Sequence, residues 1–281
     1  MSSVLSVVRE CGFWVAGIAS VGILEILSLK TIKRLLRHKY DLRRTGAMEN
    51  IVIRPIGVIH SCFTEKFGIP RQSGMVKSAT ATLELLPPFN REEMVRGLDF
   101  FSHIWVHFLF HRTVEEGWRP TVRPPWLGGK KRVGIFATRS PHRPNHMGMS
   151  AVKLVDIRRE KKRYFLELSG VDFLDQTPVL DIKPYVPFSD SIAGATSGYT
   201  KIDKPRIKLK FSEQVLQFCT SYEQETGRKI QLLIEEMIRQ DPRPASQKGK
   251  KSRFGMLLWD VNIRWQVMGL QFEVLGCRRI Q

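Results

Sequence analysis

Short runs of β-branched and aromatic residues, separated by glycine and proline, recur between residue 49 and about residue 200. In residues 79–85, small or polar residues alternate with apolar ones, which is typical of a strand with one buried face. One short helix is expected over residues 91–98, with Asn90 as its N-cap. Many short strands and few helices predict an all-β barrel or sandwich. The other predicted strands lie at residues 51–53, 57–59, 103–111, 133–138, 152–157 and 164–168.

The C-terminal part of the chain has a different pattern. A stretch rich in Ser, Gly, Ala and Thr at residues 189–200 indicates a loop or domain boundary. A helix is expected to begin at Ser212, and a second helix spans Gly227–Gln240 with one apolar face. Asp241 precedes a proline and ends that helix, and a returning antiparallel pair of strands follows. The chain thus divides into an N-terminal extension, a mainly β barrel domain and a small α+β domain, at residues 1–47, 48–200 and 201–281.

The N-terminal extension differs in composition from everything that follows. Residues 11–29 are apolar except for Glu25 and a few small polar residues, and residues 30–44 are rich in Lys and Arg. An apolar run followed by cations resembles a signal-anchor whose flank stays in the cytoplasm. The run is short, and Glu25 near the bilayer centre would cost about 2–3 kcal/mol. We expect a cytoplasmic protein in which this segment is an optional extension before Met48, with membrane contact through residues 11–44 as the alternative.

Positive charge is the unusual feature of the composition. The chain has 45 Lys and Arg against 27 Asp and Glu, a formal net charge of +18. Such an excess favours a polyanionic partner, with nucleic acid first and an anionic membrane second. The four cysteines are scattered and form no CxxC pair. The sequence therefore supports neither a zinc knuckle nor a disulfide framework and favours a reducing compartment.

Several common catalytic motifs are missing from the sequence. It has no G-x-G-x-x-G turn after a strand, no P-loop lysine motif and no nucleophile elbow, which argues against a Rossmann cofactor domain. His103, His107 and His111 are spaced by four, but on a strand the outer two lie roughly 26 Å apart, too far for one metal ion. We therefore expect a half-buried strand and no metal site. His111 differs because it lies at the strand end beside Arg112, where sites are commonly built.

A stiff cationic loop begins at the strand predicted near residue 133. Its sequence, GIFATRSPHRPNHMGMS, presents Arg139 and Arg143 on a backbone whose φ angles are fixed by two prolines. Three other loops share this polar, proline-stiffened character: FGIPRQSG, VDFLDQTPVLDIKPY and DPRP, at residues 67–74, 171–185 and 241–244. Together the loops offer carboxylates, cations and an aromatic hydroxyl on rigid supports, as a binding site demands.

Eight stretches of the sequence occur in a characteristic order: PIGVIHS, EKFGIPRQSG, VRGLDFFSHIWVHFLFH, WRPTVRPP, GIFATRSPHRPNHMGMS, DQTPVLDIKPYVPF, DPRP and DVNIRW. This ordered set resembles the TrmO family, also called TsaA-like proteins, over about residues 51–280. The resemblance implies an S-adenosylmethionine-dependent tRNA methyltransferase built on an antiparallel β-barrel. It also implies N6-methylation of the threonylcarbamoyl-adenosine next to the anticodon of threonine tRNA. A homodimer, with the cofactor bound close to the subunit interface, is a further implication.

Carried over position by position, the resemblance implies a cofactor site built from four parts of the chain. Its residues are Pro70, Arg71, Gln72, His111, Arg112, Arg139, Met149, Asp172, Phe173, Leu174, Asp175 and Gln176. Arg143 lies farther out in its loop and is an RNA or loop-bracing contact. The sequence departs from the family pattern at His146, where the loop usually has proline, and at Gln176, where the turn has glycine. A glutamine there must avoid or strain a positive φ.

The chemistry of these residues suits the implied reaction. The positive sulfonium of the cofactor is better tolerated near Asp172 or Asp175 than among cations, while the methionine carboxylate and the tRNA phosphates need arginines. Methyl transfer to a poorly nucleophilic, urea-like nitrogen should rest on orientation and on removal of one proton. Asp181, His111 and Tyr185 are the candidates for the base that takes this proton.

Two hypotheses from other classes of protein stay open beside the enzyme. A non-catalytic basic RNA-binding barrel would bind RNA without any need for S-adenosylmethionine. A membrane-tethered adaptor would lose its function on removal of residues 1–47. The enzyme predicts methyl transfer, and the ordered motifs favour it.

Overall fold

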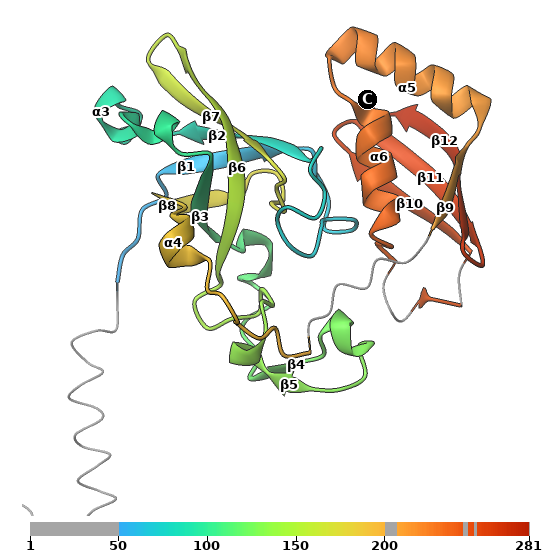
Figure 1. The fold of residues 1–281 in the computed structure, drawn as a ribbon, viewed down its shortest axis with the longest axis horizontal. Coiled ribbons are helices and arrows are strands. Elements are labelled where there is room, and N and C mark those ends of the chain that lie inside the picture. Colours follow the sequence, from blue (N-terminus) through green and yellow to red (C-terminus); the bar gives the residue numbers. More distant parts are fainter. Residues whose placement is uncertain (1–50, 200–206, 244–246, 250–251, 281) are drawn as a thin grey trace, which may run out of the picture. The chain divides into compact units, whose positions relative to one another are not determined.

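The computed structural model describes residues 51–199, 207–243, 247–249 and 252–280 (Figure 1). From Arg54 onward the chain forms one compact unit. The N-terminal extension, with its apolar run and basic flank, lies outside the described residues, and so does the membrane contact considered for it. Within the described ranges, no helix is long and apolar enough to cross a membrane.

Six antiparallel strands close into a barrel, in the order β1-β2-β7-β6-β3-β8 (Figure 1). Every second side chain along a strand points into the barrel and fills its interior. In β3, for example, Ile104, Val106 and Phe108 are buried while His103 faces solvent. The predicted fold class, mainly β with an antiparallel barrel, is confirmed. The barrel strands are β1 (Gly57–Ser61), β2 (Thr80–Leu85), β3 (His103–Leu109), β6 (Met147–Glu160), β7 (Arg163–Ser169) and β8 (Pro178–Pro184).

Two strand predictions in this region were wrong, and one strand was missed. Residues 51–53 form no strand. The strand predicted before the cationic loop is reduced to β5 (Val133–Gly134) and a 3-10 turn, η4 (Ile135–Ala137). Ile135 is buried but Phe136 is 79% exposed, so this apolar run does not form a continuous buried strand. Conversely, β8 lies in a stretch that we predicted as a loop. The prediction rested on the prolines at both ends of this stretch and on the acidic residues in it.

Short helical segments connect the barrel strands. The predicted helix over residues 91–98 is only α3 (Glu92–Val95), and its N-cap is Arg91 rather than Asn90. The Asn90 side chain instead donates a hydrogen bond of 3.0 Å to the Lys162 carbonyl oxygen, so it serves a long-range contact. The other helical segments between barrel strands are η1 (Leu98–Phe100), η2 (His111–Thr113) and η3 (Pro125–Leu127), and α4 (Pro187–Asp190) follows β8. The short strand β4 (Thr121–Val122) pairs with β5.

The C-terminal lobe combines two helices with a four-stranded sheet, as the predicted α+β character requires. Its elements are β9 (Lys208–Phe211), α5 (Glu213–Thr226), α6 (Ile230–Arg239), β10 (Arg253–Leu258), β11 (Val261–Met268) and β12 (Gln271–Arg279), and the sheet order is β10-β11-β12-β9. Ser212 caps α5 as its Oγ accepts from the Val215 backbone N–H. The parallel strand β9 was missed in the sequence. The exact domain boundary near residue 200 stays a prediction.

Hydrogen bonds fasten the lobe to residues 62–78, a segment of the barrel domain with almost no regular secondary structure. This segment contains the PRQ turn of the predicted cofactor site. The bonds run from Trp259 N to Cys62 O (2.8 Å), from Leu257 N to Glu65 Oε1 (2.9 Å), from Ser78 N and Oγ to Glu236 Oε2 (both 2.8 Å), and from Gln240 Nε2 to Met75 O (3.1 Å).

Candidate cofactor site

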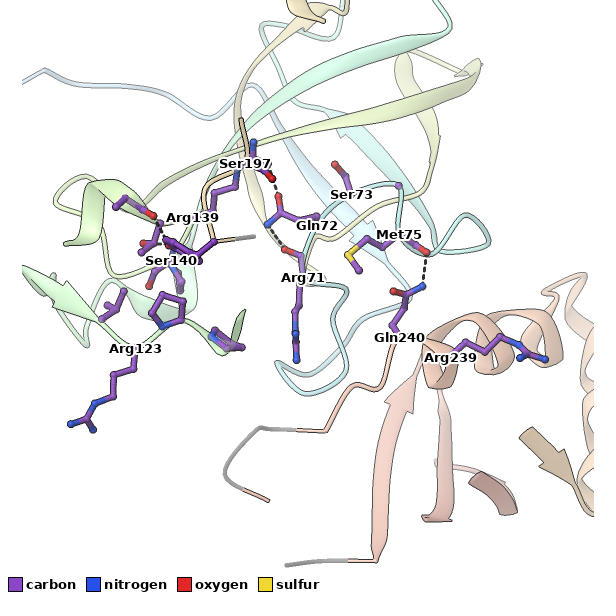
Figure 2. A pocket seen from close by; sticks show the side chains of 18 of the residues that line it. Arg71, Gln72, Ser73, Met75, Arg123, Arg139, Ser140, Ser197, Arg239 and Gln240 are labelled. Carbon is purple, nitrogen blue, oxygen red and sulfur yellow. Dashed lines mark hydrogen bonds between the residues drawn. The ribbon is translucent and has the colours of Figure 1, made fainter. Parts of the chain in front are cut away.

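A cavity of about 2110 Å³ lies beside the PRQ turn (Figure 2). Arg71, Gln72 and Arg139 all line it. Arg139 Nη1 donates a hydrogen bond of 2.5 Å to Gln72 Oε1, across 67 residues of sequence, and Gln72 Nε2 donates to the Arg71 carbonyl oxygen. The PRQ turn and the cationic loop, which only the family resemblance had connected, therefore meet at one cavity.

The cationic loop is braced by its own side chains. Arg143 Nη1 donates 2.7 Å to the carbonyl oxygen of Thr138, which agrees with the bracing alternative for this arginine. At the base of the loop, Glu116 contacts His142 Nε2 at 2.9 Å and Lys66 Nζ at 2.8 Å. Hydrogen bonds from Lys66 and His142 lower the pKa of Glu116 to about 2, so this carboxylate stays ionised. The loop thus presents Arg139 from a fixed backbone.

Asp172 is the most perturbed acid of the predicted site. Its Oδ1 is shielded from solvent and, within the described part of the chain, has no hydrogen-bond partner. Burial raises the pKa of Asp172 to about 6, against hydrogen bonds from Ser150 and Ser73 and the charge of Arg139, which lower it. A buried carboxylate oxygen without a partner is costly. Buried carboxyls with a raised pKa and an arginine within electrostatic reach are common at ligand-binding sites.

The turn after Asp172 is held by side-chain contacts and carries the expected strain. The Ser61 backbone N–H donates 2.9 Å to Asp175 Oδ1. Gln176 has φ +61° and so occupies the left-handed region that the family's glycine would take without cost. Its Nε2 lies 3.3 Å from Asp175 Oδ2 and 3.2 Å from His60 Nδ1. His146, the other departure from the family pattern, also has a positive φ, +49°.

His111 begins η2, immediately beyond the barrel strand β3. Burial lowers its pKa, and the charge of Arg112 lowers it further, while the Asp175 carboxylate acts in the opposite direction. The imidazole is therefore neutral at pH 7 and able to accept a proton. The structure thus brings His111, Arg112 and Asp175 within electrostatic reach of one another.

The other two candidate bases lie on or next to β8. Asp181 is exposed and pairs in register with His107, and the Tyr185 ring packs against Trp105 at 5.6 Å between centroids. Among the described residues, those that line the cavity include none of the three candidate bases. No group of three or more His, Cys, Asp or Glu side chains in the described ranges could hold a metal ion.

The cavity contains part of the predicted site and adds residues that sequence reasoning missed. Pro70, Arg112, Met149 and the stretch from Asp172 to Gln176 are not among the described lining residues. The missed residues include Lys77, Tyr199, Glu236, Arg239 and Gln240. Three of these belong to the end of α6, whose apolar periodicity pointed only to packing. The nearby DPRP motif is a structural ion pair, with Arg243 Nε 2.6 Å from Asp241 Oδ1.

A closed barrel whose loops bring two arginines to one cavity, with a buried carboxyl within electrostatic reach of Arg139, has the architecture of a small-molecule-binding barrel protein. Residues 58–191 match the model of the tRNA-methyltransferase O N-terminal domain, and residues 204–280 match that of the TrmO C-terminal domain. The chain therefore belongs to the tRNA-methyltransferase O family, which confirms the family predicted from the ordered motifs.

Individual relatives agree with this assignment. The tRNA (adenine(37)-N6)-methyltransferase of Escherichia coli is 44% identical over 232 residues, which cover 82% of this chain and 98% of the relative. A Pseudomonas aeruginosa protein, whose name describes S-adenosylmethionine-dependent methyl transfer, is 47% identical over 76% of this chain and 91% of its own length. A crystal structure of TrmO from Pseudomonas aeruginosa superposes with a TM-score of 0.66 at 40% identity, and covers 82% of this chain and 99% of that one.

Proposed function

We propose that this protein transfers a methyl group from S-adenosylmethionine to N6 of the threonylcarbamoyl-adenosine next to the anticodon of threonine tRNA. Membership of the family and the name of the Escherichia coli relative support the coarser activity, methylation of tRNA adenine 37 at N6. One structural observation carries the proposal: Arg139 meets the PRQ turn at a cavity, within electrostatic reach of the buried Asp172 carboxyl.

The charges of the site fit the cofactor. Arg71 and Arg139 supply donors for its carboxylate. The unpartnered Oδ1 of Asp172 suits its ammonium or sulfonium charge, because a buried anion is stabilised by an opposite charge. When bound, S-adenosylmethionine supplies a methyl group activated by the positively charged sulfur. The remaining proposed cofactor contacts are Pro70, Gln72, His111, Arg112, Met149, Phe173, Leu174, Asp175 and Gln176.

His111 is our choice for the group that takes the proton lost from N6. Its lowered pKa keeps the imidazole neutral at pH 7, and the Asp175 carboxylate stabilises the charged form once the proton arrives. Asp181 is exposed on β8 and Tyr185 packs against Trp105, so neither has comparable support from a neighbouring acid of the site. The rigid loops contribute the other part of catalysis, which is orientation.

We further propose that the protein is a homodimer, as the family resemblance implies. Exposed apolar side chains lie on and beside β6: Phe100 is 86% exposed, and Val155 of β6 is 57% exposed. The Ser102 carbonyl oxygen accepts 2.9 Å from Leu154 N, which places the Phe100 segment alongside β6. Phe100→Glu should convert dimers to monomers in light scattering. A wild-type protein that is monomeric at micromolar concentration would contradict the dimer.

Mass spectrometry of threonine tRNA nucleosides tests the function directly. Cells that lack the gene should lose the N6-methylated nucleoside and keep its unmethylated precursor, and the gene should restore it. With purified protein, methyl transfer to precursor tRNA should require S-adenosylmethionine. If the protein bound tRNA equally well with and without the cofactor and transferred no methyl group, the non-catalytic RNA-binding barrel would replace the enzyme.

A further inference from the structure

A long stretch of the barrel domain is basic without any acid to balance it. Residues 117–155 contain eight Lys or Arg and no Asp or Glu. Residues 117–136, which we call the basic arm, hold five of these cations and fold around the two-stranded sheet of β4 and β5. This small sheet is separate from the barrel sheet. The five cations are Arg119, Arg123, Lys130, Lys131 and Arg132.

The cations of the basic arm are exposed and lack ionic partners. All five are exposed, and in the described ranges none forms an ion pair. Some surface cations elsewhere are matched, as Arg158 is by Glu167 and Arg239 by Glu235. An unbalanced cluster raises the local potential and attracts a polyanion. The arm is therefore a part of the described chain where positive charge is not compensated by acids nearby in the sequence.

Two aromatic side chains accompany these cations. Trp118 is 60% exposed and Phe136 is 79% exposed, at the two ends of the arm. Phe136 also lines the cavity, together with Arg123. Cations flanked by exposed aromatic rings fit looped or single-stranded nucleic acid, because phosphates meet the cations while unstacked bases stack on the rings.

The arm is held in its conformation by hydrogen bonds within it and by one to the cationic loop. Arg119 N donates 3.1 Å to the His142 carbonyl oxygen, and Ile135 N donates 3.0 Å to the Pro120 carbonyl oxygen. Arg132 Nη1 donates 3.0 Å to Thr121 Oγ1 across the small sheet. A preordered surface loses less entropy on binding. Since the arm also forms one wall of the cavity, RNA bound on it lies next to the cofactor site.

We propose that the basic arm is the docking surface for the loop of the substrate RNA, with Lys130 and Lys131 on its phosphates and Phe136 under an unstacked base. The proposal rests on the proposed function in so far as the RNA is a tRNA. The stacking surface beside the cavity favours RNA over an anionic membrane.

Matched pairs of neighbouring lysines test the electrostatic part. Lys130→Ala/Lys131→Ala removes two charges from the arm, and Lys161→Ala/Lys162→Ala removes two from the exposed turn between β6 and β7. The experiment uses full-length protein and threonine tRNA. For the arm variant, the negative slope of log K against log salt should become shallower by about 1.4. Relative to 1 M salt, where the charges contribute little, this change corresponds to binding that is about 25-fold weaker at 0.1 M salt. The control pair should change the affinity less than about threefold. Isothermal titration with S-adenosylmethionine should be unchanged in both.

Phe136 tests the stacking part. Phe136→Ala should weaken tRNA binding about 5- to 100-fold without a change in salt slope, and Phe136→Tyr should restore it. Equal losses in the arm and control pairs, or an unchanged salt slope in the arm variant, would overturn the proposal. So would an arm variant that lost binding to phosphatidylserine vesicles but kept its affinity for tRNA. Wild-type protein that bound tRNA through the arm but transferred no methyl group would contradict the proposed function, while the proposal that the arm binds RNA would still hold.

Discussion

Asp172→Asn should stabilise the protein at neutral pH while it weakens the binding of S-adenosylmethionine. The pKa of this carboxyl is raised from 3.8 to about 6, chiefly by burial. Because each pKa unit corresponds to about 1.4 kcal/mol, the ionised side chain costs about 3 kcal/mol of folding free energy at pH 7.5. The amide of the new asparagine places an N–H without an acceptor where Oδ1 now lacks a partner. This buried N–H costs about 1 kcal/mol, which is subtracted from the gain. A net gain of about 2 kcal/mol remains.

The pH dependence of this gain identifies its cause. A carboxyl whose folded pKa lies above its unfolded value binds more protons in the folded state between about pH 4 and pH 6, so the wild type regains stability as the pH falls through that window. The difference in unfolding free energy between Asp172→Asn and wild type should therefore shrink by about 2 kcal/mol between pH 7.5 and pH 4.5. Urea denaturation at the two pH values measures it.

Asp99→Asn is the matched control, because Asp99 is an exposed carboxyl. This variant should differ from wild type by less than about 0.5 kcal/mol at either pH. The reasoning about Asp172 is refuted if Asp172→Asn is less stable than wild type at pH 7.5, or if its advantage does not change with pH. A gain in stability together with a loss of cofactor affinity would mean that the buried charge is kept for binding.

Three further substitutions probe the site and its support. Arg139→Ala should weaken S-adenosylmethionine binding by about 1.5–3 kcal/mol in isothermal titration, and change tRNA affinity far less; the reverse pattern would overturn its assigned role. Gln176→Gly should raise the unfolding free energy by up to about 1 kcal/mol, since φ is +61°, and a loss would show that the side-chain hydrogen bonds of Gln176 outweigh its strain. Gly148→Ala would place its Cβ 2.5 Å from Phe108 Cε2 and should cost about 1–3 kcal/mol in urea denaturation, whereas an unchanged midpoint would mean that the ring moves freely.

Much of the barrel could be predicted because alternation reports burial directly. The strand at residues 103–109 shows this, with its buried and exposed positions in the predicted order. Prediction failed where local sequence and tertiary pairing disagree. Pro178 and Pro184 made β8 look like a loop, yet both residues lie at strand ends, where the missing N–H matters least. Asn90 looked like a helix cap, but a long-range bond to Lys162 holds its side chain.

The candidate site was predictable only as separate pieces. The arginines and carboxylates could be listed from stiff loops and from the family resemblance, but no local pattern says that Arg139 reaches Gln72. The contribution of α6 was invisible for a similar reason. Gln240 reaches the Met75 carbonyl oxygen 165 residues away, and such a contact depends on how the lobe packs rather than on the helix's own periodicity.

The hydrogen bonds between the lobe and residues 62–78 have a consequence for conformational entropy. The segment has little secondary structure to fix its shape, so contacts of the lobe at Cys62, Glu65, Met75 and Ser78 help to order it, beside backbone hydrogen bonds to the barrel such as Gly74 N to Gly170 O. Without those anchors each residue would recover about 1–2 kcal/mol of backbone freedom at room temperature. The lobe therefore helps to hold the PRQ turn in one conformation. A substitution that loosens a residue of the lobe, even one that never contacts the cofactor, would let the turn adopt many conformations, few of which could bind the cofactor.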